Sequence, residues 1–244
     1  MKLVVTGATG FVGQEVIRLA LQNRAITSTI ALARSNVSVP ENGGPDADTS
    51  KLKSVVLTDW ENPYPEHVIE QLKGADACVW TLAITPKKSK GLEFEAVMKV
   101  CHDYTIKGLN QIASVANKPF RFIYTSGAPA ERDQTKIPPF HPDYCLMRGR
   151  VENAVLDLAT RLAPAVEVAI IRSGCVEGPG HPKTEAVTRI WEHYGPTPWV
   201  HVTELAATMI EQGLHGINMN TLYANDIEEI RSSVLKTEEP VSLE

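Results

Sequence analysis

Three glycines near the start of the chain have the spacing of a phosphate-binding turn. Gly7, Gly10 and Gly13 are each separated by two residues, and they follow the short β-branched apolar run 2–6. Such glycines allow a tight turn, close backbone approach to a pyrophosphate and close contact between helix and strand. An apolar-periodic stretch follows, so the helix start would offer free N–H groups and a positive dipole end to phosphates. The pattern predicts a dinucleotide-binding turn between a strand and a helix.

Arg34 stands where such a site usually selects its cofactor. Residues 29–33 read as a second strand, and Arg34 follows it, 21 residues after Gly13. A chain that prefers NAD usually places an acid about 20 residues past the glycines, to bind the ribose 2′-hydroxyl. A guanidinium suits a 2′-phosphate instead, because its planar fork donates two parallel hydrogen bonds. We therefore expect NADP (NADPH), with a solvated arginine at a strand end as the alternative.

The motif at residues 6–13, Thr-Gly-Ala-Thr-Gly-Phe-Val-Gly, resembles the opening of the extended and atypical short-chain dehydrogenase/reductase (SDR) families. Further matches follow in the expected order along nearly the whole chain. The resemblance implies an α/β fold with a doubly wound parallel sheet of the Rossmann type. It implies one domain over residues 1–244, with a small cap on the substrate side from about 176–200 and the C-terminal region.

The active pair of this family is Tyr-x-x-x-Lys on one helix, and Tyr144 and Arg148 occupy its two positions. The resemblance implies that the Tyr144 hydroxyl gives a proton to a carbonyl oxygen while the nicotinamide delivers hydride. The family's lysine holds the nicotinamide ribose and lowers the tyrosine pKa. Arg148 keeps the charge and the donors, although its larger planar head would reach the ribose differently. A surface arginine is the alternative for Arg148.

The catalytic serine of the family lies at the tip of the strand that we expect at 120–125. Ser126 follows that strand and is the candidate, with Thr125 as a substitute. Related extended enzymes often carry a third hydroxyl where this chain has Gly127.

Further cofactor contacts are implied at the ends of other strands. The expected third strand, 54–59, ends in Asp59, which the family places beside the adenine amino group; a helix N-cap or a turn is an equal contender. The end of the fourth strand (75–83) should line the cofactor crevice, and the turn after the sixth strand (166–172) should pass beside the nicotinamide. The implied cofactor contacts are Thr6, Gly7, Thr9, Gly10, Phe11, Val12, Gly13, Arg34, Asp59, Thr81, Leu82, Ala83, Cys175 and Val176.

The remaining pattern predicts helices and two segments that could shape a substrate site. The proline-rich loop 129–142 could form a lid, and residues 181–200 hold Trp191, Tyr194 and Trp199, which read as a pocket wall, a small cap or ordinary packing. Thr203 reads as the N-cap of a later helix. The other helices are expected at 66–73, 92–116, 144–162 and 225–235.

Composition excludes several classes of function. A net charge of −5 and a pI near 5.8 argue against a nucleic-acid-binding surface. No run approaches the ~18 uncharged apolar residues of a membrane span. The four cysteines are scattered without a C-x-x-C pair, which makes a metal site improbable and favours reduced thiols in a cytoplasmic protein.

The leading hypothesis is an NADPH-dependent oxidoreductase of the atypical SDR type that reduces a carbonyl of a small organic substrate. Arg148 and Gly127 depart from the family pattern. Both departures favour the alternative, a catalytically inactive NAD(P)-binding regulator or sensor. An isomerase or lyase that retains its cofactor is a third possibility. A homodimer is possible.

Overall fold

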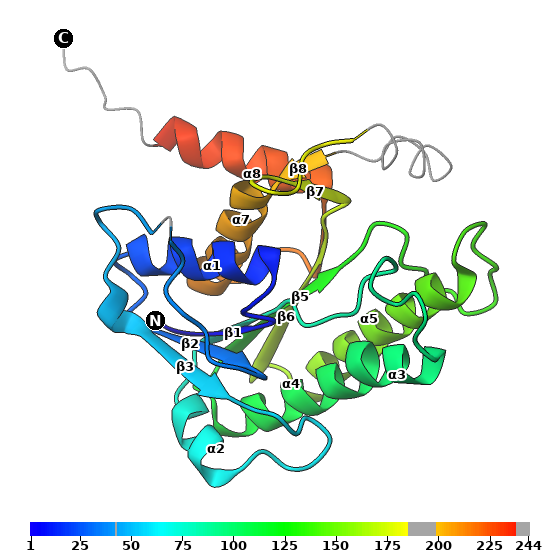
Figure 1. Cartoon of the computed structure of the whole chain (residues 1–244), viewed down its shortest axis with the longest axis horizontal. Coiled ribbons are helices and arrows are strands. Elements are labelled where there is room, and N and C mark those ends of the chain that lie inside the picture. Colours follow the sequence, from blue (N-terminus) through cyan, green and yellow to red (C-terminus); the bar gives the residue numbers. More distant parts are fainter. Residues whose placement is uncertain (42, 185–198, 238–244) are drawn as a thin grey trace.

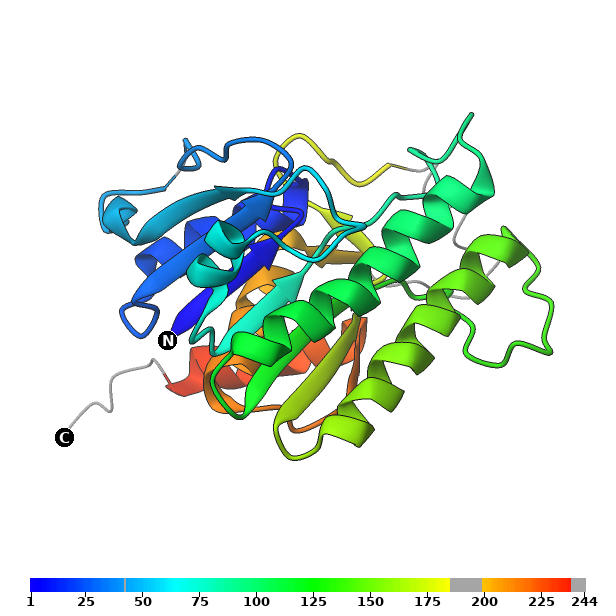
Figure 2. The same ribbon diagram turned by 90° about the horizontal axis from the view of Figure 1, so that it is seen from below.

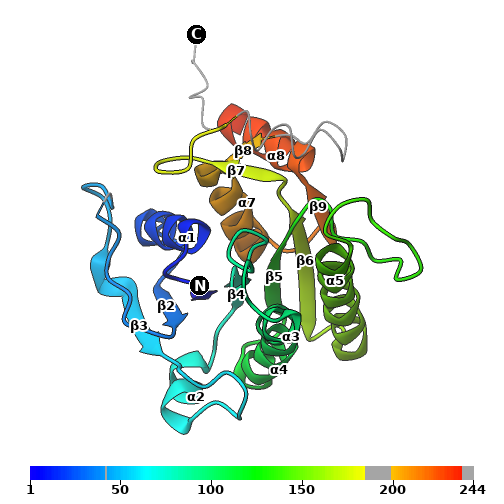
Figure 3. The ribbon, with the colours of Figure 1, turned by 45° about the vertical axis from the view of Figure 1, so that its right-hand side comes forward.

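A parallel sheet forms the centre of the computed structural model, which describes residues 1–41, 43–184 and 199–237. Within these residues the sheet has seven strands in the order β3-β2-β1-β4-β5-β6-β9, and every pair is parallel (Figure 3). The strands are β1 (Lys2–Thr6), β2 (Ser28–Ala33), β3 (Leu52–Val56), β4 (Ala77–Trp80), β5 (Phe120–Ser126), β6 (Val166–Arg172) and β9 (Thr221–Tyr223). The chain order reverses between β1 and β4, which creates the crevice where doubly wound sheets bind ligands. The predicted doubly wound sheet is confirmed.

Helices cover both faces of the sheet (Figure 1, Figure 2). One face carries α1 (Phe11–Gln22), α7 (Val202–His215) and α8 (Ala224–Thr237). The other carries α2 (Glu66–Leu72), α3 (Phe94–Met98), α4 (Tyr104–Val115) and α5 (Pro142–Leu162). Successive residues of a strand face opposite sides, so in β5 Phe122 packs toward α4 and α5 while Ile123 packs toward α7. Burial on both faces explains why the central strands are nearly continuous apolar runs.

The long helix expected at 92–116 contains a break in its hydrogen-bond pattern. A π-helical segment, η2 (Lys99–Asp103), joins α3 to α4. Cys101 lies in this segment and is fully buried, and its carbonyl accepts a hydrogen bond from the Thr105 hydroxyl at 2.8 Å. Such π-helical turns are frequent at functional sites, and hydrophobic periodicity does not reveal them.

Three local predictions are corrected. The third strand lies at Leu52–Val56 instead of 54–59, because the short turn η1 (Thr49–Lys51) leads straight into it at the sheet edge. The N-cap of α7 is His201 instead of Thr203: the His201 Nδ1 accepts a hydrogen bond from the Thr203 N–H at 3.3 Å. The short strand β9 was missed, since three residues are too few to show a period.

The predicted cap falls largely outside the described residues. Strands β7 (Cys175–Glu177) and β8 (Trp199–His201) pair in a separate parallel sheet. Trp191 and Tyr194 belong to residues that the structure does not describe, so the pocket wall at 181–200 stays a prediction. Among the described helices, none combines the length and the apolarity that crossing a bilayer requires.

Candidate functional site

The turn between β1 and α1 requires glycine at two of its three positions. Gly7 has φ +65°, and a Cβ there would lie 2.6 Å from the Thr81 hydroxyl oxygen. A Cβ on Gly13 would lie 2.4 Å from the Gly7 carbonyl oxygen. Gly10 has an ordinary extended backbone, and a Cβ there would meet only the Gly7 oxygen, at 3.1 Å. Gly7 and Gly13 therefore serve the fold, whereas a Cβ on Gly10 would need only a small shift of the Gly7 carbonyl.

The start of α1 is suited to a phosphate group. Gly10 is its N-cap and has no side chain to satisfy the first N–H groups, and the first turn carries no acidic residue. The Thr6 hydroxyl beside it is buried without a hydrogen-bond partner in the described part of the chain. Free N–H groups at a helix start and its positive dipole end form an anion site. These residues fit the pyrophosphate of a dinucleotide.

Arg34 and Asp59 follow neighbouring strands but differ in their surroundings. Thr6 pairs with Leu32, so Arg34 emerges from β2 beside the glycine turn. Its side chain is exposed, and the structure shows no ion pair for it with any described residue. Asp59 accepts hydrogen bonds from the N–H groups of Glu61 at 2.9 Å and Asn62 at 3.1 Å, and the bonds from Asn62 lower the pKa of Asp59. Asp59 thus forms a turn, and its contact with adenine stays a prediction.

Other predicted cofactor contacts meet at the same edge of the sheet. The Thr81 hydroxyl donates to the Thr6 carbonyl at 2.6 Å, which places Thr81, Leu82 and Ala83 beside the glycine turn. Phe11 stacks on His181, with ring centroids 3.9 Å apart, so the turn after β6 reaches the start of α1. Thr9 is exposed at the turn, and Val12 and Val176 are half-buried. Burial raises the pKa of Cys175 to about 11.

Tyr144 lies in the first turn of α5 and reaches across to the chain after β4. Its hydroxyl donates to the Ile84 carbonyl at 3.0 Å, while the Ile84 N–H donates to the Cys101 sulfur at 3.3 Å. The Ile84 peptide is therefore held between the π-helical turn and the tyrosine. Burial raises the pKa of Tyr144 above its usual value, against the positive charge of Arg148. In the family pair the charge of the lysine lowers the tyrosine pKa. Here the effect of burial exceeds that of the Arg148 charge, and the pKa of Tyr144 is raised.

Arg148 is buried beneath the site, which excludes the surface alternative. Its side chain is 5% exposed, and its guanidinium carbon lies 5.0 Å from the centroid of the Tyr124 ring. Its Nη2 donates to the Thr125 carbonyl. Its Nη1 is buried and has no hydrogen-bond partner among the described residues. The guanidinium thus links α5 to the tip of β5 and keeps one donor uncommitted.

Ser126 is bound by a buried carboxylate. Its hydroxyl donates to Glu152, which lies one helical turn beyond Arg148 on α5. The Thr125 hydroxyl oxygen is buried and unpartnered within the described chain. The structure therefore brings together Tyr144, Arg148 and the Thr125 carbonyl, and the catalytic roles of Ser126 and Thr125 stay predictions.

Glu152 was not anticipated from the sequence. It is fully buried, and its Oε2 accepts hydrogen bonds from Arg132 Nε and Arg172 Nη2, each at 2.6 Å. Arg132 belongs to the loop after β5, so this carboxylate fastens that loop to α5 and β6. A glutamate inside a helical pattern reads as exposed, and no local signal marks it as the centre of a cluster.

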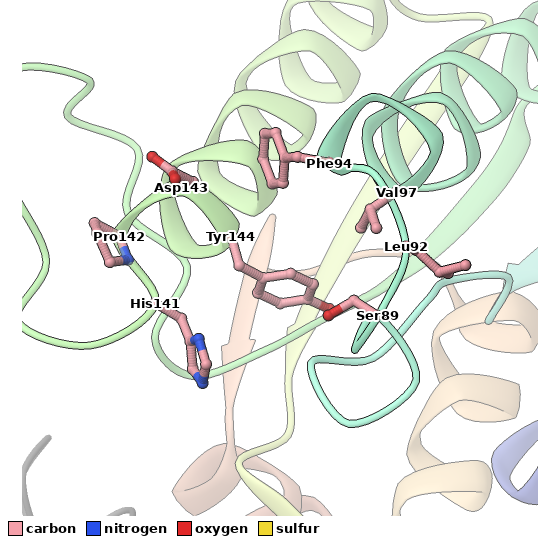
Figure 4. Close-up of a pocket in the computed structure, with 8 residues that line it drawn as sticks. All are labelled: Ser89, Leu92, Phe94, Val97, His141, Pro142, Asp143 and Tyr144. Atoms are coloured by element: carbon pink, nitrogen blue, oxygen red, sulfur yellow. The ribbon is translucent and has the colours of Figure 1, made fainter.

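A pocket of about 340 Å³ opens beside Tyr144. In Figure 4 the Tyr144 ring lies among the residues that line this pocket. The lining residues are Ser89, Leu92, Phe94, Val97, His141, Pro142, Asp143 and Tyr144. His141 has φ +44°, a strained conformation of the kind that clusters at functional sites. Tyr144 was predicted as a site residue, and His141 and Pro142 belong to the loop 129–142 that was expected to shape a substrate site. Sequence reasoning missed Ser89, Leu92, Phe94, Val97 and Asp143, because Phe94 and Val97 fitted a helical apolar period and the others carried no signal.

Comparison with known proteins identifies the family of the chain. Residues 7–147 match the family model described as NAD(P)H-binding. No curated protein matches the chain in sequence.

Solved structures share the fold at low sequence identity. Vestitone reductase from alfalfa (Medicago sativa) is 21% identical, with 98% of this chain and 82% of that chain covered and a TM-score of 0.66. A short-chain dehydrogenase family protein from Francisella tularensis is 16% identical, with coverages of 93% and 98% and a TM-score of 0.65. A dTDP-glucose 4,6-dehydratase from Streptomyces venezuelae with NAD bound is 18% identical, with coverages of 97% and 81% and a TM-score of 0.65. The predicted resemblance to SDR-type Rossmann proteins is confirmed at the level of the fold.

Proposed function

The chain belongs to the NAD(P)H-binding family, and from this premise we propose that it is an NADPH-dependent oxidoreductase that reduces the carbonyl group of a small organic substrate. One observation carries the proposal. The hydroxyl-bearing side chain of Tyr144 lines a pocket at the same edge of the sheet as the glycine turn. The Tyr144 hydroxyl binds the carbonyl of Ile84, three residues beyond Thr81, and the Thr81 hydroxyl binds the Thr6 carbonyl at the glycine turn. The segment after β4 therefore runs from the proposed dinucleotide site to the proposed proton donor, and carbonyl reduction requires both.

Each group has a definable task in this reaction. Bound NADPH supplies the hydride. Tyr144 gives its hydroxyl proton to the carbonyl oxygen, and for this the hydroxyl turns from the Ile84 carbonyl, 3.0 Å away, to the substrate. The buried positive charge of Arg148 opposes the effect of burial on the Tyr144 pKa and so makes the phenol a better acid. Leu92, Phe94 and Val97 give one side of the pocket an apolar surface.

Tyr144→Phe tests the proposed acid. The variant keeps the ring and its packing and deletes only the hydroxyl, so the melting temperature and NADPH affinity should stay close to wild type. Turnover of a ketone should fall by roughly 10²–10⁴, the usual contribution of positioned acid catalysis. NADPH oxidation at 340 nm is the measurement, and full activity in the variant would refute the role of Tyr144.

The preference for NADP rests on Arg34. We expect Arg34→Ala to weaken NADPH binding by about 1.5–3 kcal/mol, the range for hydrogen bonds to charged groups, and to leave NADH binding unchanged. Arg24→Ala is the matched control, because Arg24 is equally exposed but precedes β2, at the opposite end of the strand. Calorimetric titration of each variant with both nucleotides measures the effect. Equal affinities of the wild-type chain for NADPH and NADH would contradict the preference.

A nucleotide-binding regulator without turnover is the second candidate. The observations that favour it are the engagement of Tyr144 by a backbone carbonyl, the engagement of Ser126 by Glu152, and the glycine at position 127. With NADPH demonstrably bound, failure of a broad panel of ketones and aldehydes to oxidise it would select the regulator.

A further inference from the structure

The pocket beside Tyr144 lacks the groups that recognise charged or nucleotide-linked substrates. Within the described chain, no lysine or arginine lines it, so it offers no cation for a phosphate or diphosphate. Its volume of about 340 Å³ is near the lower end of ligand pockets, which run from about 300 to 1,000 Å³. Among the described lining residues, a sugar nucleotide would find no cation for its diphosphate, and the volume is small for so large a ligand.

The lining is apolar on the side formed by the segment before and within α3. Val97 is buried at its base, whereas Leu92 is 49% and Phe94 42% exposed. Such large side chains bordering a cavity offer apolar surface that a ligand would remove from water. Figure 4 shows these three residues on the segment that faces Tyr144 at the start of α5.

Polar groups contribute about as much of the lining as apolar ones. Ser89 and His141 can exchange hydrogen bonds with a neutral substituent, and Asp143 is an exposed carboxylate that disfavours an anion nearby. The lysines at 87, 88 and 90 flank Ser89 in sequence, but they are exposed and do not line the pocket.

We propose that the substrate is a neutral, ring-containing apolar carbonyl compound, such as an aryl or alicyclic ketone, held by Phe94, Leu92 and Val97 with its carbonyl oxygen toward Tyr144. This inference rests on the proposed reductase function, and it names the substrate class for that site. Leu92, Phe94 and Val97 contact the ring and orient it. Tyr144 lines the same pocket, so its hydroxyl can donate a proton to the carbonyl group of the ring compound.

A matched series of carbonyl compounds tests the proposal in the presence of NADPH. The series comprises acetone, acetophenone, 1-tetralone, 4-acetylbenzoate and UDP-glucose. We expect kcat/KM to rise at least 100-fold from acetone to the aryl ketones, since the larger ring removes more apolar surface from water when it binds. We expect 4-acetylbenzoate to be at least 10-fold poorer than acetophenone.

Saturation-transfer NMR on the same compounds reports binding without turnover. Phe94→Asp should abolish transfer to the ring protons of acetophenone and lower kcat/KM at least 10-fold, while Phe94→Leu should stay within threefold of wild type. Leu162→Asp is the control, because Leu162 is an exposed apolar residue at the far end of α5 and does not line the pocket.

The two measurements separate the substrate class from the reaction. One outcome is that saturation transfer to the ring protons is seen and Phe94→Asp abolishes it, while no ketone is turned over. That outcome would refute the reductase function and support the proposed ligand class. The proposal is overturned if 4-acetylbenzoate or UDP-glucose binds better than acetophenone, or if Phe94→Asp binds acetophenone as wild type does. It is also overturned if Phe94→Asp leaves kinetics intact and only dissociates a dimer, since Phe94 would then belong to a subunit contact.

Discussion

Glu152→Gln offers the sharpest test of how the loop after β5 is held. The substitution keeps the shape of the side chain and removes its charge, leaving Arg132 and Arg172 without their counter-ion. Breaking a buried ion pair by changing one partner costs about 3–5 kcal/mol. Arg132 has 31% of its side chain exposed and can regain water, so the lower end of that range applies, about 3 kcal/mol.

That loss converts into a measurable change in melting temperature. For a chain of this size, 1 kcal/mol corresponds to about 2–4 °C, so Glu152→Gln should melt about 6–12 °C below wild type. Glu167→Gln is the matched control: Glu167 pairs with Arg121 at 3.0 Å, but its side chain is 39% exposed. An exposed pair contributes about 0–1 kcal/mol, so the control should shift by less than about 4 °C.

Calorimetry measures both variants, and limited proteolysis of the loop reports the local effect. Because Arg132 anchors the loop through Glu152, cleavage between residues 133 and 141 should be faster in Glu152→Gln than in the control. The smallest expected decrease in melting temperature is roughly 6 °C. If Glu152→Gln melts within about 2 °C of wild type, the cluster contributes no net stability. The reasoning about the anchored loop would then be wrong.

Two further predictions concern the glycine turn and the pH dependence. Gly13→Ala should lower the melting temperature more than Gly10→Ala, because its Cβ would lie 2.4 Å from the Gly7 carbonyl oxygen and that of Gly10→Ala 3.1 Å. Gly10→Ala should also lose NADPH affinity. Thermal melts and calorimetric titrations measure both effects, and equal melting temperatures would contradict this prediction. The raised pKa of Tyr144 keeps the phenol protonated at neutral pH, so the rate of ketone reduction should stay level from about pH 7 to 9 and fall only above the usual phenol pKa of about 10. A loss of kcat centred near pH 8 that Tyr144 titration explains would refute the assignment.

The sequence predicted the central strands best, and burial explains why. The sixth strand lies at Val166–Arg172 as predicted, because a strand covered on both faces must be apolar along its length. The edge strand β3 has exposed residues at Lys53 and Ser54, so its pattern is weaker and its position was misjudged by two to three residues. β9 is too short to give any pattern, although it completes the sheet.

Only those parts of the site that lie in local sequence motifs were predictable. The positions of Tyr144 and Arg148 follow from their spacing along one helix. The partner of Ser126 does not, because Glu152 lies 26 residues away and meets it only after α5 packs on β5. The pocket likewise forms between the segment at 89–97 and the start of α5, a juxtaposition that no single stretch of sequence contains.

Arg148 changes how the proton donor is supported, and the change follows from the shape of its side chain. A lysine ammonium is a compact point charge, whereas a guanidinium is a plane with several fixed donors. In this chain the plane lies over Tyr124, and one Nη binds the Thr125 carbonyl. The other Nη is buried and has no hydrogen-bond partner among the residues that the structure describes. The charge therefore stays beside Tyr144 because strand β5 holds it there. A ligand that accepted a hydrogen bond from the second Nη would meet a donor whose position is fixed by the sheet. Arg148→Lys would restore the residue pair of the family, but it would lose the bond to the Thr125 carbonyl.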